Sequence, residues 1–393
     1  MQGDRDDLLE PGPRIPRANG KLASPFHTLA YLARTAPIPG ATAVVVTHDL
    51  DTAPFLLEAL GRGLHIQSAM MVPHPESQPS PSRNPSWPVQ VATPSKELFT
   101  KTLLDELQAA ALTGNRVMLL DVGGWGAQIA SLIGDLDNFL GVVEDTNQGH
   151  WRYAACGPLE FPCVSVAQGD FKALENIRVG DAVAFSIEEI LRRHLGLVVA
   201  EASFSVLGYG GVGQAVVQSL LRRGARVDVF DPDPIRLTHA AMVGAGYGSR
   251  RAVLSRADVV VGCSGTESFT LADLDYVKSG VVLASASSRD VEFYEVVQAL
   301  RAFEDEPTEL QEFSADARSV LLVNGGYPVN FIHGSRLGAA LDLVYSEVYM
   351  AMRELAQSLH SPGLHETSVE SRSIVAQTWL NNRLVMAGGS GLA

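Results

Sequence analysis

FSVLGYGGVGQAVVQSLLRRGARVDVFDPDP, from Phe204 to Pro234, is the stretch that decides the fold. It places a G-x-G-x-x-G motif between a strand-like apolar run and a helix-like run, and a second strand-like run ends at Asp231. The first glycine permits a tight turn, the second lets a pyrophosphate approach the backbone, and the third lets the helix pack closely on the strand. The N–H groups that open the helix can bind phosphates. The stretch therefore predicts a β-α-β dinucleotide-binding unit with contacts from Gly208, Gly210, Gly211, Val212 and Gly213.

Asp231 predicts which dinucleotide is bound. Its carboxylate can accept hydrogen bonds from both hydroxyls of a ribose, and its negative charge repels a 2′-phosphate, which favours NAD over NADP. A glycine-rich turn that binds nothing is the alternative interpretation. The complete strand, turn, helix and strand around the motif favour the binding interpretation.

Strand-like and helix-like runs alternate along most of the chain. This alternation predicts parallel sheets that are covered by helices on both faces, and hence an α/β fold with two doubly wound, Rossmann-like domains. Helices are expected at residues 52–63, 95–114, 181–196 and 338–359. Strands are expected at residues 41–48, 64–72, 116–121, 139–145, 203–207, 226–230, 258–262, 281–285 and 319–323.

The composition excludes several classes of protein. A net charge of −14 over 393 residues argues against broad contact with nucleic acid or an anionic membrane. No apolar run approaches the roughly 20 residues that span a bilayer. The acidic, proline-broken start is unlike a secretory signal, and the three cysteines lack CxxC spacing. The histidines lack the spacing of a metal site. We expect a cytoplasmic protein without a metal, which acts on a small molecule.

Polar residues gather at the ends of the predicted strands in the first half of the chain. Because ligands of open α/β sheets bind beyond the carboxyl ends of the strands, these residues are candidates for a site. Each of them alone could brace a turn or cap a helix, but their convergence on one edge favours ligand binding. They are His48, Asp121, Glu144 and Asp145, and Thr146, Asn147 and Gln148 follow directly.

Several ordered segments, from about residue 28 to 356, resemble the S-adenosylhomocysteine hydrolase family. GYGGVGQA with GARVDVFDPDPI is similar to the family's GYGDVGKG with GARV and E-x-DPI. EDTNQG at 144–149 is similar to EETTTG, and PCVSVAQGDFK at 162–172 is similar to P-A-x-N-V-N-D-S-x-T-K. ADVVVGCSGT, RDVEF and GGYPVNF, which begin at residues 257, 289 and 325, resemble further family segments.

The resemblance implies a domain plan and an assembly. Residues 1–25, which the sequence itself indicates to be a flexible arm, would precede a substrate domain formed by residues 26–182 with 336–380. The NAD-binding Rossmann domain, residues 183–335, would be inserted in it. The family also implies a homo-oligomer, either a dimer or a tetramer.

The resemblance implies a reaction in which NAD is used and regenerated. A ribose 3′-hydroxyl is oxidised, and the resulting ketone acidifies the neighbouring C4′–H. A base removes that proton, the 5′ group leaves, and the stored hydride returns to C3′.

The resemblance assigns roles residue by residue. Lys172 falls on the lysine that handles the 3′-hydroxyl proton, and His48 on a histidine beside the 5′ leaving group. Asp145 replaces a substrate-binding glutamate, and Glu144 is a further catalytic candidate. The expected NAD contacts beyond the glycine turn are Thr146, Asn147, Gln148, Asp231, Ser264 and Asn330. The expected substrate contacts are His48, Asp121, Asp145, Lys172, Asn176, Ser288 and His333.

The departures from the family pattern fall on the substrate side. DDGGD becomes DVGGW, so that Val122 replaces an aspartate, and GHFD becomes SSRD, so that Ser288 replaces a histidine. GHPSF is absent, although His333 lies nearby, and the lysine–tyrosine tail is missing. We therefore expect that NAD binding is retained and that the reaction differs.

Three interpretations of function follow. The favoured one is a lyase or dehydratase that eliminates a 5′ group from an adenine nucleoside, with epimerisation at C4′ as its close variant. Glu144, Asp145 or His333 would be the C4′ base. The second is true S-adenosylhomocysteine hydrolysis, and the third is a non-catalytic, NAD-binding regulatory homologue. The retained Lys172 and His48 favour an enzyme over the third interpretation.

Overall fold

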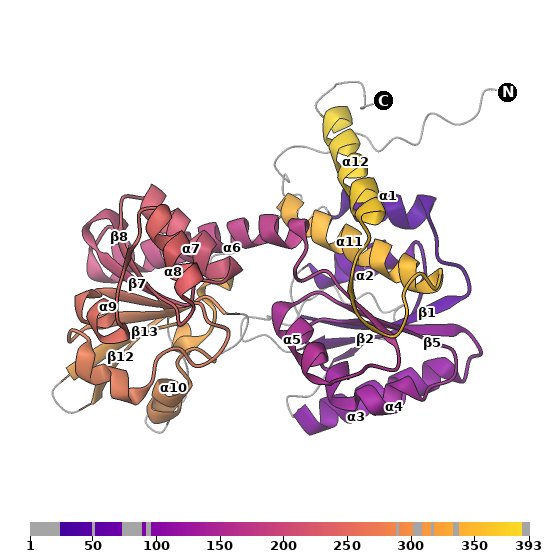
Figure 1. The fold of residues 1–393 in the computed structure, drawn as a ribbon, viewed down its shortest axis with the longest axis horizontal. Coiled ribbons are helices and arrows are strands. Elements are labelled where there is room, and N and C mark those ends of the chain that lie inside the picture. The colour runs from indigo at the N-terminus through magenta and orange to yellow at the C-terminus, as the bar shows by residue number, and fades with distance from the viewer. Residues whose placement is uncertain are drawn as a thin grey trace. The chain divides into compact units, whose positions relative to one another are not determined.

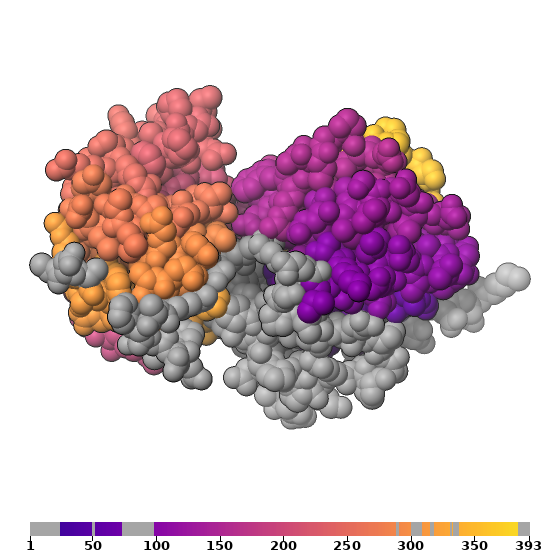
Figure 2. All heavy atoms as spheres, turned by 90° about the horizontal axis from the view of Figure 1, so that it is seen from below, coloured from indigo at the N-terminus to yellow at the C-terminus, as the bar shows by residue number. Residues whose placement is uncertain are grey.

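The chain divides into two compact units in the computed structural model (Figure 1). Unit 1 comprises Met1–Lys172 with Gly338–Ala393, and unit 2 comprises Ala173–Leu337. The division falls at Lys172, whereas the sequence analysis placed a boundary at residue 182. Figure 2 shows the units as atoms coloured by residue number. The structure describes residues 24–48, 52–72, 89–91, 96–287, 291–301, 309–315, 318–332 and 338–386, so nearly all of the expected arm lies outside the described residues.

Unit 1 is built on a seven-stranded sheet of order β14-β6-β5-β4-β1-β2-β3. All of its strand pairs are parallel, so the carboxyl ends of the strands meet at one edge. Runs of valine, leucine and methionine suit strands that are buried on both faces. The strands are β1 (Ala41–His48), β2 (His65–Val72), β3 (Val89–Val91), β4 (Arg116–Asp121), β5 (Phe139–Glu144), β6 (Pro162–Ser165) and β14 (Gly363–Glu366).

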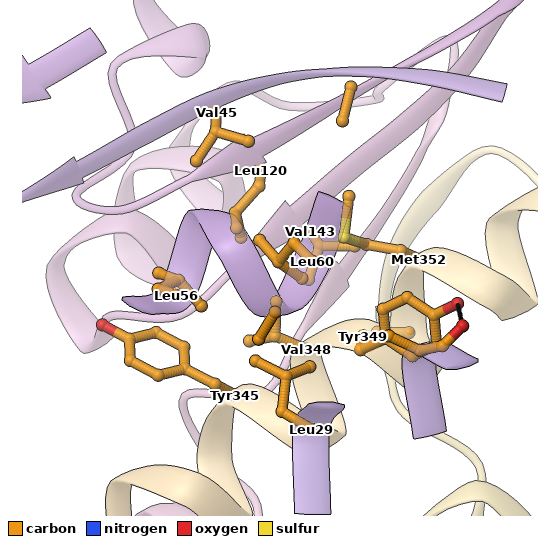
Figure 3. Close-up of a cluster of buried hydrophobic side chains, with 14 of the residues drawn as sticks. Leu29, Val45, Leu56, Leu60, Leu120, Val143, Tyr345, Val348, Tyr349 and Met352 are labelled. Carbon is orange, nitrogen blue, oxygen red and sulfur yellow. Dashed lines mark hydrogen bonds between the residues drawn. The ribbon is translucent and has the colours of Figure 1, made fainter. Parts of the chain in front are cut away.

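Helices cover both faces of the unit 1 sheet. One buried cluster joins Leu29, Leu60, Val143, Val348 and Met352 on one face (Figure 3). A second cluster on the other face includes residues of α3 and α4. The helices are α1 (His27–Thr35), α2 (Ala53–Gly61), α3 (Lys96–Ala111), α4 (Ala130–Gly134), α5 (Asn147–Ala155), α11 (Gly338–Ala356) and α12 (Val369–Met386), with the 3-10 turn η1 (Gly126–Ile129).

Unit 2 holds a second seven-stranded sheet, of order β12-β13-β11-β10-β7-β8-β9. Only the edge pair β12–β13 is antiparallel among its described strands. Buried clusters line both faces of this sheet as well. The strands are β7 (Ser203–Leu207), β8 (Arg226–Phe230), β9 (Gly246–Tyr247), β10 (Val259–Gly262), β11 (Val281–Ser285), β12 (Leu310–Ala315) and β13 (Arg318–Val323).

The helices of unit 2 alternate with its strands. Helix α6 begins in unit 1 and ends in the π-helical turn η2 (Leu191–Leu195). The α-helices are α6 (Asp170–Ile190), α7 (Gly211–Arg222), α8 (Pro234–Met242), α9 (Arg250–Arg256) and α10 (Tyr294–Arg301). The 3-10 turns are η3 (Val199–Glu201), η4 (Leu271–Tyr276), η5 (Asn324–Gly326) and η6 (Val329–Phe331).

The predicted α/β class with two parallel, doubly wound sheets is confirmed. The sequence analysis did not predict β3, β6, β9, β12 and β14, and it began α6 eleven residues too late, at 181 rather than Asp170. Except for the six-residue β12, these strands have only two to four residues, which is too short to show a periodic pattern. Within the described ranges, no helix is long and apolar enough to cross a membrane.

Candidate functional site

The glycine turn of unit 2 is shaped by close backbone contacts. Gly208 has φ +98°, and a Cβ there would lie 2.8 Å from the carbonyl oxygen of Cys263. A Cβ at Gly213 would lie 2.1 Å from the carbonyl oxygen of Gly208, so the close packing of α7 on the strand excludes a side chain. A Cβ at Gly210 would meet no atom within 4 Å. The turn therefore presents open space at Gly210, directly before the first N–H groups of α7.

Asp231 lies beside this turn, at the end of β8. Its side chain is buried, and its two oxygens accept hydrogen bonds from Tyr209 N at 2.7 Å and Asp233 N at 2.9 Å. The guanidinium of Arg236 lies 3.5 Å from the same carboxylate. Asp231 thus fixes the backbone of the turn from the position where a dinucleotide-binding domain needs its ribose acceptor.

Two asparagines of unit 2 lie at the same carboxyl-end edge. Asn176 on α6 packs against the glycine turn, since a Cβ at Gly211 would lie 2.5 Å from its amide nitrogen. The sequence analysis assigned Asn176 to the substrate, whereas the structure places it against the nucleotide turn. Asn330 on η6 is buried, and its amide oxygen has no hydrogen-bond partner among the described residues. An unpaired buried acceptor is costly, which marks Asn330 as a position for an external donor.

Glu292 braces the loops that follow β10 and β11, and the sequence analysis missed it. Its carboxylate accepts hydrogen bonds from Ser264 Oγ at 2.9 Å, from Gly265 N at 2.6 Å, and from the Ser287 hydroxyl. Burial raises the pKa of Glu292. Ser264, an expected NAD contact, is therefore held by a buried carboxyl group. Glu292 is the glutamate of the RDVEF segment, which the sequence analysis compared with the family only as a whole segment.

In unit 1, Asp121 and Glu144 are completely buried at the ends of β4 and β5. Glu144 accepts hydrogen bonds from Gly123 N at 3.1 Å, from Gly124 N at 2.9 Å, and from both Thr146 N and Thr146 Oγ at 2.7 Å. These internal donors surround the carboxylate, so the geometry argues against Glu144 as the base that attacks a substrate.

Asp121 has the same bracing role. It accepts hydrogen bonds from Trp125 N at 3.1 Å, Gly126 N at 2.8 Å and Tyr153 Oη at 2.8 Å. Burial raises the pKa of Glu144 well above its usual range, and the carboxylate of Asp121 raises it further. The two acids together hold the loop that includes Val122, which is itself buried.

Asp145 and Lys172 are brought together at this edge. Lys172 Nζ lies 3.1 Å from Asp145 Oδ1, and the side chains are only 12% and 6% exposed. Asp145 follows β5, and Lys172 lies in the first turn of α6. A shielded, hydrogen-bonded ion pair of this kind holds the amine in one position.

Residues 182–332 match the family model described as "S-adenosyl-L-homocysteine hydrolase, NAD binding domain". Over this NAD-binding unit, the chain is similar to the S-adenosyl-L-homocysteine hydrolase family. The family resemblance and the expected NAD-binding domain are thus confirmed.

Three relatives show how far this relationship extends. An uncharacterised protein of Mycobacterium tuberculosis is 27% identical over 66% of this chain and 51% of its own length. An adenosylhomocysteinase of Thermotoga maritima is 31% identical over 51% of this chain and 50% of its own. An S-inosyl-L-homocysteine hydrolase of Methanothermobacter thermautotrophicus is 26% identical over 63% of this chain and 61% of its own length. The chain thus spans about half to three-fifths of the length of these relatives.

The residues of unit 2 fit an NAD molecule. The open space at Gly210 and the start of α7 would receive the pyrophosphate, and Asp231 lies where a ribose would bind. The unpaired amide oxygen of Asn330 would accept a hydrogen bond from the nicotinamide amide. Each position lies at the carboxyl ends of the unit 2 strands.

The remaining predicted residues lie at known positions in unit 1 or outside the described residues. Thr146 caps α5, and its hydroxyl accepts a hydrogen bond from Gly149 N at 3.0 Å. Asn147 accepts a hydrogen bond from the side chain of Gln168, and Gln148 lies in the first turn of α5. His48 is half-buried at the end of β1. Ser288 and His333 fall outside the described residues.

Glu347 on α11 is a second residue that the sequence analysis missed. It is 1% exposed, and its Oε2 has no hydrogen-bond partner among the described residues. Burial raises the pKa of Glu347 to about 7, although the guanidinium of Arg372 opposes this shift. Glu347 lies between Val344 and Val348 in a largely apolar helix, so no local pattern marked it as a candidate.

Proposed function

We propose that the chain is an NAD-dependent enzyme that acts on an adenine nucleoside through transient oxidation of its sugar 3′-hydroxyl. The ketone then allows loss of the C4′ proton and either elimination of a 5′ group or epimerisation. One observation carries the proposal. The shielded Lys172–Asp145 pair is retained at the ligand edge of unit 1, in a chain whose other unit is an NAD-binding domain.

Lys172 would take the proton from the 3′-hydroxyl oxygen, because an amine is the proton acceptor that this oxidation needs. Asp145 would hold the amine in position and contact a sugar hydroxyl. NAD, when bound, supplies the hydride acceptor and later the hydride donor. His48, at the end of β1, would protonate the departing 5′ oxygen.

Elimination or epimerisation is favoured over hydrolysis by the altered polar groups of unit 1. The family's second aspartate is replaced by the buried Val122, while Asp121 and Glu144 are occupied by the loop they brace. Fewer groups therefore remain to activate and orient a water molecule for addition.

True hydrolysis is the second candidate, and the relatives support it. Two of them are named adenosylhomocysteinase and S-inosyl-L-homocysteine hydrolase, and these names imply different purines on one type of scaffold. Hypoxanthine nucleosides therefore belong in any substrate panel beside adenine nucleosides.

The deciding experiment follows a deuterium label at the sugar C3′. The purified protein is first heated, and mass spectrometry of the released material tests for NAD. The protein is then incubated with labelled nucleosides, and transfer of deuterium to the nicotinamide ring is measured. Transfer supports the proposal, whereas turnover without transfer excludes it.

Product mass separates the outcomes. Loss of one water from the nucleoside indicates a dehydratase, and an unchanged mass with altered retention indicates an epimerase. Release of homocysteine from S-adenosylhomocysteine indicates the hydrolase. Bound NAD without any turnover leaves the regulatory interpretation.

A further inference from the structure

The carboxylate of Asp231 is covered and largely occupied by the protein itself. Its side chain is only 1% exposed. Its Oδ2 accepts a hydrogen bond from Tyr209 N at 2.7 Å and also faces Arg236 Nη1, and its Oδ1 accepts a hydrogen bond from Asp233 N at 2.9 Å. A carboxylate offers about four acceptor positions. One position, on Oδ1, therefore remains for a single ribose hydroxyl, whereas the sequence analysis expected Asp231 to bind two.

Arg236 is the exposed charge beside this buried carboxylate. Its side chain is 49% exposed, and it lies in the first turn of α8. Its Nη1 is 3.5 Å from Asp231 Oδ2, and its Nε is 3.7 Å from Asp233 Oδ2. Both distances exceed the usual hydrogen-bond range of roughly 2.7–3.2 Å. Its Nη2 has no partner among the residues that the structure describes. The guanidinium is therefore held loosely and can turn toward a ligand.

The stability of α8 does not explain the position of Arg236. A cation in the first turn of a helix opposes the helix dipole, because the N-terminal end of a helix favours anions. Asp233, the N-cap of α8, already accepts a hydrogen bond from Ile235 N at 2.8 Å. The start of the helix is thus complete without the arginine, and exposed ion pairs add little stability.

The surroundings of Asp231 correspond to one position of a bound dinucleotide. In a β-α-β nucleotide unit, the acid that ends the second strand contacts the 2′-hydroxyl of the ribose, and a nearby arginine receives a 2′-phosphate where one is present. β7, α7 and β8 form this unit, and Asp231 follows β8. Because Arg236 Nη1 lies 3.5 Å from the Asp231 carboxylate, the guanidinium reaches the region of the 2′ substituent.

We propose that Arg236 is a specificity-determining residue of the dinucleotide site, which lets the 2′-phosphorylated dinucleotide NADP bind as well as NAD. Two N–H groups of the planar guanidinium can bind two oxygens of a phosphate at once, and the positive charge offsets that of Asp231. NAD lacks this phosphate, and its ribose hydroxyl would use the remaining acceptor position on Asp231 Oδ1. The proposal concerns which dinucleotide is recognised, so it does not depend on the proposed reaction.

Calorimetric titration with two pairs of ligands tests this role. The full chain, freed of any copurified dinucleotide, is titrated with NAD and NADP, and then with ADP-ribose and its 2′-phosphate derivative, which lack the nicotinamide. We expect the Kd of NADP to lie within about tenfold of the Kd of NAD in the wild type. Arg236→Ala should raise the ratio of the two Kd values by at least about tenfold, mainly by weakening NADP. The ADP-ribose pair should show the same change.

Three further variants complete the test. Arg236→Lys keeps the charge but loses the planar fork, so it should give an intermediate Kd ratio. Asp233→Asn removes an exposed negative charge beside Arg236, while asparagine still caps α8, so it should lower the ratio several-fold. Arg256→Ala is the matched control. Arg256 is also 49% exposed, but it is bonded to Asp228 at 2.8 Å, so its removal should leave the ratio unchanged.

Thermal unfolding separates a lost ligand contact from a folding defect. Because Arg236 contributes little to α8, the dinucleotide-free Arg236→Ala variant should melt at the wild-type temperature. An unchanged Kd ratio in Arg236→Ala overturns the proposal. Equal weakening of NAD and NADP also overturns it, because Arg236 would then contact the adenosine that both ligands share.

The wild type alone distinguishes failure of this proposal from failure of the proposed function. Binding of NAD without NADP overturns the role of Arg236 and leaves the proposed reaction intact. Turnover without deuterium transfer excludes the proposed reaction, while a Kd ratio that depends on Arg236 still supports its role. A wild type that binds neither dinucleotide contradicts both.

Discussion

Lys172 and Asp145 are 27 residues apart in sequence, and the fold joins them in an ion pair of 3.1 Å. The sequence analysis selected both residues from local motifs. It treated Asp145 as a substitute that is one methylene shorter than the family's glutamate. In the structure this shorter side chain still reaches the lysine amine. Their pairing depends on β6, a strand that the sequence analysis did not predict, because Asp145 follows β5 and Lys172 follows the neighbouring β6.

The substitution Lys172→Met tests this residue most directly. We expect the substitution to lower turnover by about 10² to 10⁴, the usual range for removal of a general acid or base, while bound NAD is retained. Nucleoside turnover and the cofactor content of the purified protein measure the two effects. Lys278→Met, which changes an exposed lysine of unit 2, is the matched control. Equal loss in both variants would contradict the assigned role.

Gly210 and Gly213 separate ligand binding from folding. A Cβ at Gly210 meets no protein atom, so Gly210→Ala should fold normally but weaken NAD binding by at least about tenfold, because the methyl group occupies the space of the pyrophosphate. A Cβ at Gly213 would lie 2.1 Å from a carbonyl oxygen, so Gly213→Ala should also lower the melting temperature of the NAD-free protein. Calorimetric titration with NAD and thermal unfolding distinguish the variants. Normal NAD binding by Gly210→Ala would exclude this geometry.

At the scale of elements, the loop between β4 and η1 depends on two buried acids. Asp121 and Glu144 were expected at a ligand site because they end strands at the correct edge. The prediction of their position was sound, but their hydrogen bonds are made to the loop that follows β4. A strand-end acid can serve either a ligand or its own loop, and the choice depends on where neighbouring N–H groups point. Only the folded backbone determines that direction.

The pH dependence of stability should reveal these acids. Burial raises the pKa of Glu144 above its unfolded value, so the folded state binds the proton more tightly than the unfolded state. Its contribution to stability is complete below the ordinary glutamate pKa of about 4.3 and is lost as pH rises toward the raised value. Denaturant unfolding at several pH values above about 4.3 should therefore show that the free energy of unfolding of the wild type falls as the pH rises. Glu144→Gln should remove this dependence of the free energy of unfolding on pH. Glu58→Gln changes an exposed glutamate and should keep the dependence, so it serves as the control.

Short elements explain most of the differences between prediction and structure. β6 and β14 have four residues each, yet β14 places Thr367 and α12 beside Glu347. Long apolar runs such as β1 and β7 were predicted to within one residue, because their composition alone favours a buried strand. Four-residue strands form only because a longer neighbouring strand offers them a partner.

For the whole molecule, binding of NAD should stabilise the protein by mass action. At a concentration of NAD one hundred times its Kd, the free energy of unfolding should rise by about 2.7 kcal/mol. Thermal unfolding with and without added NAD measures this effect, and Gly210→Ala should respond only weakly. A wild-type melting temperature that does not change with NAD would argue against the NAD-binding turn.

The dimer or tetramer that the family resemblance implies is still a prediction, which a measurement of the mass in solution can test. α12 exposes apolar side chains, including Val369, Ile374 and Leu380. Light scattering coupled to size-exclusion chromatography should give two or four times the 42.0 kDa of one chain. A monomer at micromolar concentration would contradict the expectation.

The sequence by itself determined the α/β class, the glycine turn with Asp231, and the resemblance to one family. These features depend on local patterns, because a tight turn, a buried strand and a helix start each require particular residues at fixed spacing. Only the tertiary structure decided that Glu144 and Asp121 brace a loop, that Asn176 lies on the glycine turn, and that Lys172 pairs with Asp145. Hydrogen-bond partners and charge neighbours depend on distances between residues far apart in the chain, and the order of residues does not specify those distances until the sheet has formed.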